Sequence, residues 1–295
     1  TDMQTILIPV NFTKSNKIAV NYAIAFAKHQ PTKIILLNAY HTIPFNWDSS
    51  DESLNRESVE LAEKSQLKLE KLAKKIRKKS NAACEKLSIK GFAADVIIEQ
   101  STVIEPDLIL IGTEILNAIN FLVLGSLTNQ VINKINGNIL IIPETAPKKP
   151  FQKIAFVTIP YNDDSQELNY LMNLTNKFES QFHIIHLLPS ETSERELNYD
   201  LKKHELDVNF SYPDHSFIFH SIVAEEPLEL LGEYVVDNRI DTVIVLKRET
   251  EIINKLIAHH STKRPTYHTN IPIFILKKEF NNHLNHLTKE EISNQ

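Results

Sequence analysis

The sequence predicts an α/β protein made of two tandem domains, each with a mainly parallel sheet. Short apolar runs such as TILIPV (5–10) and DLILIG (107–112) alternate with amphipathic segments. Continuous apolar runs are typical of parallel strands that are buried on both faces, and strand–helix alternation indicates right-handed crossovers. The same succession of runs then occurs a second time along the chain.

The first copy contains two further apolar runs, KIILLNA (33–39) and NILII (138–142), which we interpret as strands. The segment SNKIAVNYAIAFAKHQ (15–30) places alanines four residues apart. Such a stripe of small residues lets a helix lie close against a sheet.

The second copy repeats the strands of the first in the same order, and over their last 35 or so residues the offset between the copies is nearly constant. KIAFVTI (153–159) matches the first strand, and DTVIVLK (241–247) begins 134 residues after DLILIGT. IPIFIL (271–276) follows NILII at almost the same offset, which indicates an internal duplication.

The prolines and lysines of PETAPKKP (143–150) suit a linker between the copies. We therefore predict one domain over about 1–146, a second over 150–278, and a polar tail over 279–295.

Composition excludes several classes of protein. The formal charge of −5 gives no electrostatic footprint for nucleic acid. The single cysteine, Cys84, excludes an intramolecular disulfide framework. No run approaches the roughly 20 apolar residues of a membrane span, and TDMQTILIPV has no signal-peptide pattern. We expect a cytoplasmic protein without a membrane partner.

Two of only five glycines flank a short stretch at the predicted ligand edge of the first sheet. Gly112 ends a strand, and Gly125 with Ser126 opens the helix SLTNQVINKI. Open parallel sheets bind ligands at the carboxyl ends of their strands, and a helix N-terminus favours an anion such as phosphate. Ser126 could cap that helix or donate its hydroxyl to a phosphate oxygen. The alternative is that these residues only end a strand and begin a helix, as glycine and serine commonly do, without binding a ligand.

The stretches ILIPVNFTKSNKIAVNYAIAFAK (6–28), LILIGT (108–113) and LGSLTNQVINKINGNILIIPE (124–144) resemble the universal stress protein family in its tandem form. The resemblance implies doubly wound, Rossmann-like domains, each with five mainly parallel strands. It also implies that the two domains pack as a pseudo-symmetric pair through their last strands, NILII and IPIFIL, which would otherwise leave exposed apolar sheet edges. Many members bind ATP through a G-x2-G-x9-G-[S/T] motif and an aspartate after the first strand. Here Gly112 and Gly125-Ser126 match the motif, whereas Ile115 replaces its middle glycine and Asn11 replaces the aspartate.

The resemblance implies that an adenine nucleotide, accompanied by Mg²⁺, would bind in the first domain, with no other metal. Pro9, Val10 and Ala39 would lie on the adenine and ribose side. The candidate binding residues are Pro9, Val10, Asn11, Ala39, Ile111, Gly112, Ile115, Gly125, Ser126 and Leu127.

The matching positions of the second domain have lost the motif. Leu246 and Glu249 replace the first two glycines, and His259-His260 replaces the closing Gly-Ser. Ile159 follows the first strand of this copy. An acid and bulky side chains would repel and obstruct a triphosphate, so we expect no nucleotide there.

Three hypotheses follow. The first is a stress-response binding and regulatory protein that senses an adenine nucleotide through its first domain. The second is an interaction scaffold whose nucleotide sites have decayed in both domains. The third is a weak ATP hydrolase, although no G-x-S-x-G or HExxH motif indicates an enzyme. Whether two chains associate further is left open.

Overall fold

The computed structural model describes most of the chain. The described residues are 3–41, 51–113, 126–158, 164–175, 178–188, 190, 194–213, 215–225, 227–249, 252–253 and 271–277. Of residues 51–54, 126 and 194–200 only the backbone is described.

Strands and helices alternate through the first half of the chain. Its elements are β1 (Gln4–Pro9), α1 (Lys14–His29), β2 (Thr32–Tyr40), α2 (Asp51–Lys79), β3 (Ala83–Lys90), α3 (Ala93–Ile104), β4 (Leu108–Thr113), α4 (Ser126–Lys134) and β5 (Ile139–Pro143).

The second half repeats this order over its described residues. Its elements are β6 (Lys153–Thr158), α5 (Ser165–Thr175), β7 (Gln181–Leu188), α6 (Glu194–Ser211), β8 (Phe217–Val223), α7 (Pro227–Asp237), β9 (Thr242–Leu246) and β10 (Ile273–Leu276). The expected α/β fold with a mostly parallel sheet is confirmed.

The ten strands of the described residues form one sheet in the order β3-β2-β1-β4-β5-β10-β9-β6-β7-β8. Each half contributes five parallel strands, and the halves meet where β5 pairs antiparallel with β10. The last strands therefore pair as the sequence predicts. Leu140 lies opposite Phe274, which is 134 positions later in the chain. Since 134 is also the offset between the two copies, equivalent residues face each other here, as they would across a two-fold axis through this pair.

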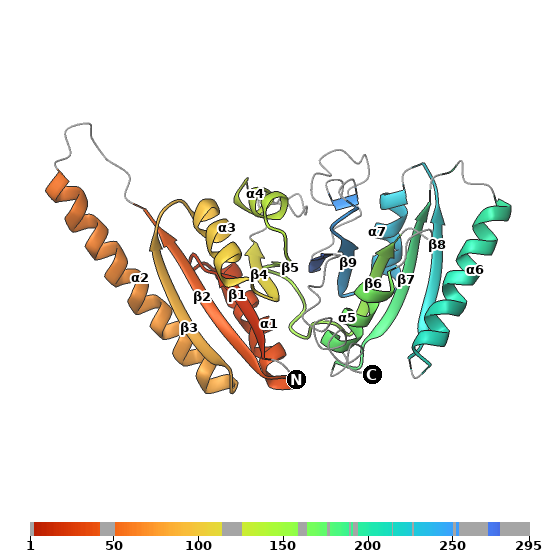
Figure 1. Ribbon diagram of the computed structural model, residues 1–295, viewed down its shortest axis with the longest axis horizontal. Coiled ribbons are helices and arrows are strands. Elements are labelled where there is room, and N and C mark those ends of the chain that lie inside the picture. Colours follow the sequence, from red (N-terminus) through yellow and green to blue (C-terminus); the bar gives the residue numbers. More distant parts are fainter. Residues whose placement is uncertain are drawn as a thin grey trace, which may run out of the picture.

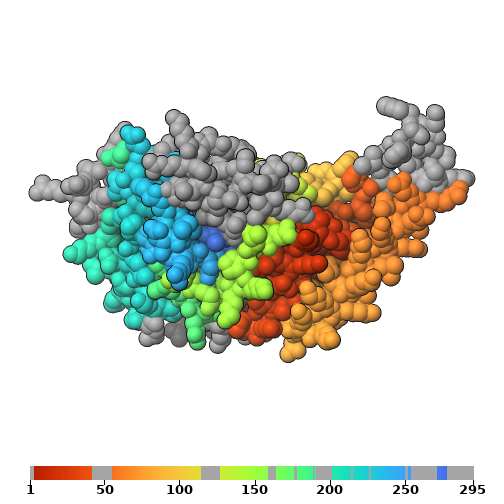
Figure 2. Space-filling view, turned by 180° about the vertical axis from the view of Figure 1, so that it is seen from behind, coloured from red at the N-terminus to blue at the C-terminus, as the bar shows by residue number. Residues whose placement is uncertain are grey.

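Helices cover both faces of the sheet (Figure 1). One face buries a cluster that takes residues from α1, α2, α5 and α6, and the other buries a cluster from α3, α4 and α7. Both clusters run through the two halves. The space-filling view from behind shows the first half and the second half side by side (Figure 2).

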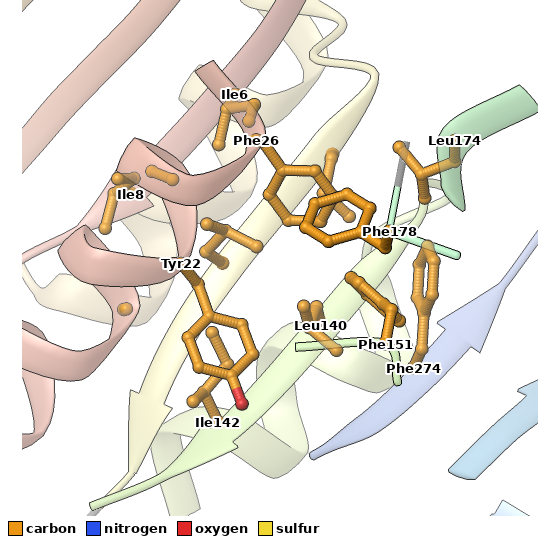
Figure 3. Packing of buried hydrophobic residues seen from close by; sticks show 14 of the residues in the cluster. Ile6, Ile8, Tyr22, Phe26, Leu140, Ile142, Phe151, Leu174, Phe178 and Phe274 are labelled. Atoms are coloured by element: carbon orange, nitrogen blue, oxygen red, sulfur yellow. The ribbon is translucent and has the colours of Figure 1, made fainter. Parts of the chain in front are cut away.

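An aromatic group closes the junction between the halves on the α1 and α5 face. The ring centroid of Phe151 lies 5.5 Å from that of Phe26 and 5.7 Å from that of Phe178, and 6.4 Å from that of Phe274 (Figure 3). Phe26, Phe151 and Phe274 are fully buried. This apolar contact spans the two halves and holds them together.

The junction is also reciprocal in its polar groups. Asp107 accepts a hydrogen bond from the Thr5 amide at 2.7 Å, and Asp241, 134 positions later, accepts one from the Lys153 amide at 2.9 Å. Burial is the largest cause of the raised pKa of Tyr22, and the negative charge of Asp241 raises this pKa further. Asp107 likewise raises the pKa of Tyr170 in the other half. Each half thus offers the other the same surface, as in a symmetric dimer.

No helix among the described residues is long and apolar enough to cross a membrane.

Candidate functional site

A cavity of about 250 Å³ lies at the carboxyl ends of β1, β2 and β4 in the first half. Its described lining residues are Pro9, Val10, Asn11, Ser15, Asn16, Leu37, Ala39, Ala93, Ile97, Ile111, Gly112, Thr113, Leu127 and Thr128. This is the edge at which open parallel sheets bind ligands. The volume lies near the lower end of the range for small-molecule pockets, which is about 300–1,000 Å³.

The structure brings seven of the ten sequence-predicted residues into this lining. They are Pro9, Val10, Asn11, Ala39, Ile111, Gly112 and Leu127. Ile115 and Gly125 lie outside the described residues. Ser126 is the first residue of α4, and its side chain is not described.

The sequence interpretation missed the contributions of α1 and α3. Ser15 and Asn16 come from the first turn of α1, and Ala93 and Ile97 come from the first two turns of α3. The signal was present for α1, because its amphipathic pattern begins directly after the first strand. No comparable signal marks Ala93, which reaches the cavity only because the crossover returns the chain to this edge.

Helix N-termini converge on the cavity. Residues in the first turns of α1 and α4 line it, and neither first turn contains an acidic residue. The first turn of α3 contains the exposed Asp95. Because a helix N-terminus carries unsatisfied amides and a partial positive charge, α1 and α4 make one end of the cavity attractive to an anion.

The loop between β1 and α1 is held by its own polar side chains. The Asn11 amide donates to Oδ1 of Asn16 at 2.7 Å, and Oδ1 of Asn11 accepts from the hydroxyl of Thr13 at 2.7 Å. Phe12 between them has a φ of 65°. A non-glycine residue at positive φ is uncommon, so these hydrogen bonds fix a strained loop at the mouth of the cavity.

Gly112, which lines the cavity, is also required by the packing of α1. A Cβ at residue 112 would lie 2.7 Å from the carbonyl carbon of Ser15, and nearer still to its oxygen. Real Cβ atoms do not approach backbone this closely, so the glycine lets α1 pack onto β4. Gly112 by itself therefore does not indicate a ligand.

None of the described side chains that line the cavity carries a charge. Leu37, Ala39, Ile97, Ile111 and Leu127 give it an apolar wall. Ser15, Asn16, Thr113 and Thr128 give it polar groups at the helix ends. The described residues also contain no group of three histidine, cysteine or carboxylate side chains placed to hold a metal ion.

The same edge of the second half is occupied by an ion-pair cluster. Arg248, just after β9, contacts Asp164 and lies 3.2 Å from a carboxylate oxygen of Glu167. Both carboxylates are only 1% exposed, and Asp164 also accepts a hydrogen bond from Thr158. Of the second-domain positions named from the sequence, Leu246 and Glu249 are described, whereas Ile159 and His259-His260 lie outside the described residues.

The register equates this cluster with the cavity lining. Ile6 pairs with Leu108 in the first half, and Ile154 pairs with Thr242 in the second. The same 148-residue offset places Asp164 at the position of Asn16 in the first half. A buried carboxylate thus replaces a neutral amide beside the corresponding helix N-terminus.

Comparison with known proteins agrees with this architecture. Residues 3–143 match the family model described as the universal stress protein family. No curated protein matches the chain in sequence.

Solved structures share the fold over both halves. A universal stress protein from Archaeoglobus fulgidus DSM 4304 is 15% identical with a TM-score of 0.71, covering 95% of this chain and 100% of its own. A functionally unknown protein from Pseudomonas aeruginosa PAO1 is 11% identical with a TM-score of 0.59, covering 99% and 98%. At these identities the likeness shows the fold alone.

A universal stress protein family protein from Arabidopsis thaliana, solved with AMP bound, covers 50% of this chain and 95% of its own. It is 19% identical, with a TM-score of 0.37. A likeness at that score says nothing about what this chain binds.

Proposed function

We propose that this chain, whose residues 3–143 match the family model described as the universal stress protein family, is a stress-response binding protein that takes up an adenine nucleotide in its first half. The observation that carries the proposal is the uncharged cavity at the ends of β1 and β4, at which the N-termini of α1 and α4 meet. The second half would act as a structural partner.

The cavity offers each part of a nucleotide a suitable surface. The aliphatic wall formed by Leu37, Ile97 and Ile111 suits the flat, apolar faces of an adenine base. Phosphate groups would lie at the first turns of α1 and α4, near Asn16 and Thr128. Ser126 and Gly125 would add donors at the start of α4, as the family motif implies.

Any Mg²⁺ would be held through the phosphates of the nucleotide. The described lining contains no carboxylate that could bind the ion directly, and Mg²⁺ commonly keeps several waters and binds substrate phosphates.

The alternative, a nucleotide-free scaffold, is favoured by one contact. Oδ1 of Asn11 accepts hydrogen bonds from the amide and hydroxyl of Thr13 within its own loop, at 3.2 and 2.7 Å. The oxygen that would replace the carboxylate of the family motif is thus engaged locally.

Thermal unfolding of the full chain with ATP, AMP and adenosine separates the two functions. A nucleotide at 100 times its dissociation constant stabilises the folded state by about 2.7 kcal/mol. Ala39→Leu, which places a larger side chain in the cavity, is expected to abolish this stabilisation. Ala83→Leu makes the same change at an exposed residue of β3 and should leave it intact.

Three outcomes are informative. Stabilisation by ATP that is lost only in Ala39→Leu supports the proposal. The absence of any shift with millimolar ATP, AMP and adenosine favours the scaffold. Phosphate release by the wild-type protein that is lost in Ala39→Leu would favour the hydrolase, whereas release that persists in this variant indicates a contaminant.

A further inference from the structure

Lys247 reaches from the second half into the first. It follows β9, and its amide donates to the carbonyl oxygen of Leu276 at 2.7 Å. Its Nζ atom donates to the carbonyl oxygen of Ile132 at 3.1 Å and also to that of Ile135. These carbonyls belong to the C-terminal end of α4, which is part of the first half.

The antiparallel junction explains this contact. In the register of β5 and β10, Ile275 near the end of β10 lies opposite Ile139 at the start of β5. β9 runs parallel to β10, so Lys247 emerges beside the point at which β5 begins. The helix α4 ends at this same point, because only a short loop separates Lys134 from Ile139. Figure 1 shows α4 above the centre of the molecule.

The contact caps the helix with a cation from the other half. The last carbonyls of an α-helix have no partner within the helix, and a lysine near them stabilises the negative end of the helix dipole. Lys247 is half-buried, and this burial is the largest cause of its lowered pKa. The positive charge of the nearby Lys277 lowers the pKa further. The two carbonyls therefore compensate an ammonium group that has lost much of its water.

The opposite end of α4 faces the cavity. Leu127 and Thr128 in its first turn line the cavity, while Val131 and Ile132 are buried against the sheet. The helix has nine residues and is therefore roughly 13 Å long. A shift at its C-terminal end would move its N-terminal amides relative to the cavity.

We infer that Lys247 is a positioning residue through which the second half sets the nucleotide affinity of the first. This inference rests on the proposed function. In this role the second half does more than pack against the first, and it acts through the ammonium group of Lys247. The register equates Lys247 with Thr113 of the first half, whose shorter side chain lines the cavity instead.

The test compares three variants of the full chain. Lys247→Met keeps the length of the side chain but removes the ammonium group. Lys247→Arg keeps a cation at this point. Lys134→Met is the matched control, because Lys134 is an exposed lysine in the last turn of the same helix. ATP and adenosine are titrated calorimetrically, and amide hydrogen exchange is followed over α4.

We expect Lys247→Met to weaken ATP binding about fivefold or more, with a smaller effect on adenosine, because only phosphates depend on the helix N-terminus. Amides of α4 should exchange faster in this variant. Lys247→Arg should retain most of the ATP affinity, and Lys134→Met should stay within about twofold of the wild type.

Wild-type ATP binding that is unchanged in a folded Lys247→Met variant would overturn the positioning role and leave the proposed function standing. Equal loss of ATP and adenosine affinity would also overturn it, because a general loosening of the fold affects both ligands. If Lys247→Met does not fold, Lys247→Gln, which also removes the ammonium charge, takes its place: ATP affinity lost selectively in this variant and retained in Lys247→Arg supports the role, and unchanged ATP affinity in Lys247→Gln overturns it. A wild-type protein that binds neither ATP nor adenosine refutes the proposed function itself, and the positioning role with it.

Discussion

The carboxyl ends of β1 and β4 and those of β6 and β9 hold matching positions in two copies of one fold, yet different side chains occupy them. In the first half, Asn16 and the other described lining residues of the cavity carry no charge. In the second half, Arg248 joins two buried carboxylates at the same edge. Since the strand register is the same in both halves, the two edges differ in these few side chains and not in the pairing of their strands.

The largest effect that we predict comes from removing the cation of the second half. Arg248→Met would leave Asp164 and Glu167 buried without the guanidinium group. Breaking a buried pair by removing one partner costs about 3–5 kcal/mol. Chemical denaturation of the full chain measures this loss. The control is Arg77→Met, which removes a guanidinium that pairs with Glu70 on the surface of α2 and should leave stability near that of the wild type. A wild-type-like Arg248→Met would mean that the cluster does not stabilise the second half.

Gly112→Ala should give the next largest effect. A methyl group at residue 112 would press against the Ser15 backbone, so α1 would have to move away from β4. Overpacking of this kind costs about 1–3 kcal/mol, and contact with backbone places this variant at the upper end. At Gly137 an added Cβ would have only ordinary contact, 3.6 Å from Cγ2 of Ile135. Gly137→Ala is therefore the control, and equal midpoints of unfolding for the two variants would contradict the close packing of α1.

The apolar runs made the strands predictable, because a strand depends on a local pattern of residues. The pairing of NILII with IPIFIL was predictable from the family resemblance and from the apolar edges that these strands would otherwise expose. The function of Gly112 was not predictable in the same way, since only the folded structure shows that α1 approaches it. The cluster of Arg248 was missed because its ion pair with Asp164 joins residues 84 positions apart. Contacts of this kind depend on where crossovers return the chain, which a pattern of residue types does not specify.

The two halves should also differ in their response to acid. His186 in β7 is 1% exposed, and burial together with His204 on α6 lowers its pKa to about 3. The register places Asn38, a residue that does not titrate, at the matching position of β2. There Nδ2 of Asn38 donates to the carbonyl oxygen of Val10 at 2.6 Å. Acid should therefore destabilise the second half first.

The sign follows from proton binding. An unfolded chain, in which a histidine has a pKa near 6.5, binds more protons than the folded chain, so this contribution is complete above about pH 6.5 and is lost as the pH falls toward 3. Between pH 7 and pH 5 the loss is about 2 kcal/mol. His186→Asn, which introduces the residue of the first half, should flatten this part of the stability profile, whereas His215→Asn at an exposed site should not. An unchanged profile in His186→Asn would show that other groups govern the acid response.

Asn16→Asp brings the comparison back to the cavity and gives the smallest predicted change. It introduces the carboxylate that the second half has at residue 164, and its oxygen can still accept the hydrogen bond from the Asn11 amide. A negative charge at the start of α1 favours the helix, but the carboxylate would be buried without a guanidinium partner and would lose the hydrogen bond that Nδ2 of Asn16 donates to the carbonyl oxygen of Pro9 at 3.4 Å, so thermal stability should fall slightly. The same charge repels phosphate, and we expect ATP to bind about tenfold more weakly, a difference of about 1.4 kcal/mol, while adenosine affinity stays the same. Asn21→Asp adds an equal charge at an exposed position further along α1 and should change ATP binding little.

If both variants weaken ATP binding equally, the overall charge governs binding and the contrast between the two helix N-termini does not. If only Asn16→Asp weakens ATP binding, a single side chain separates the edge that binds an anion from the edge that does not.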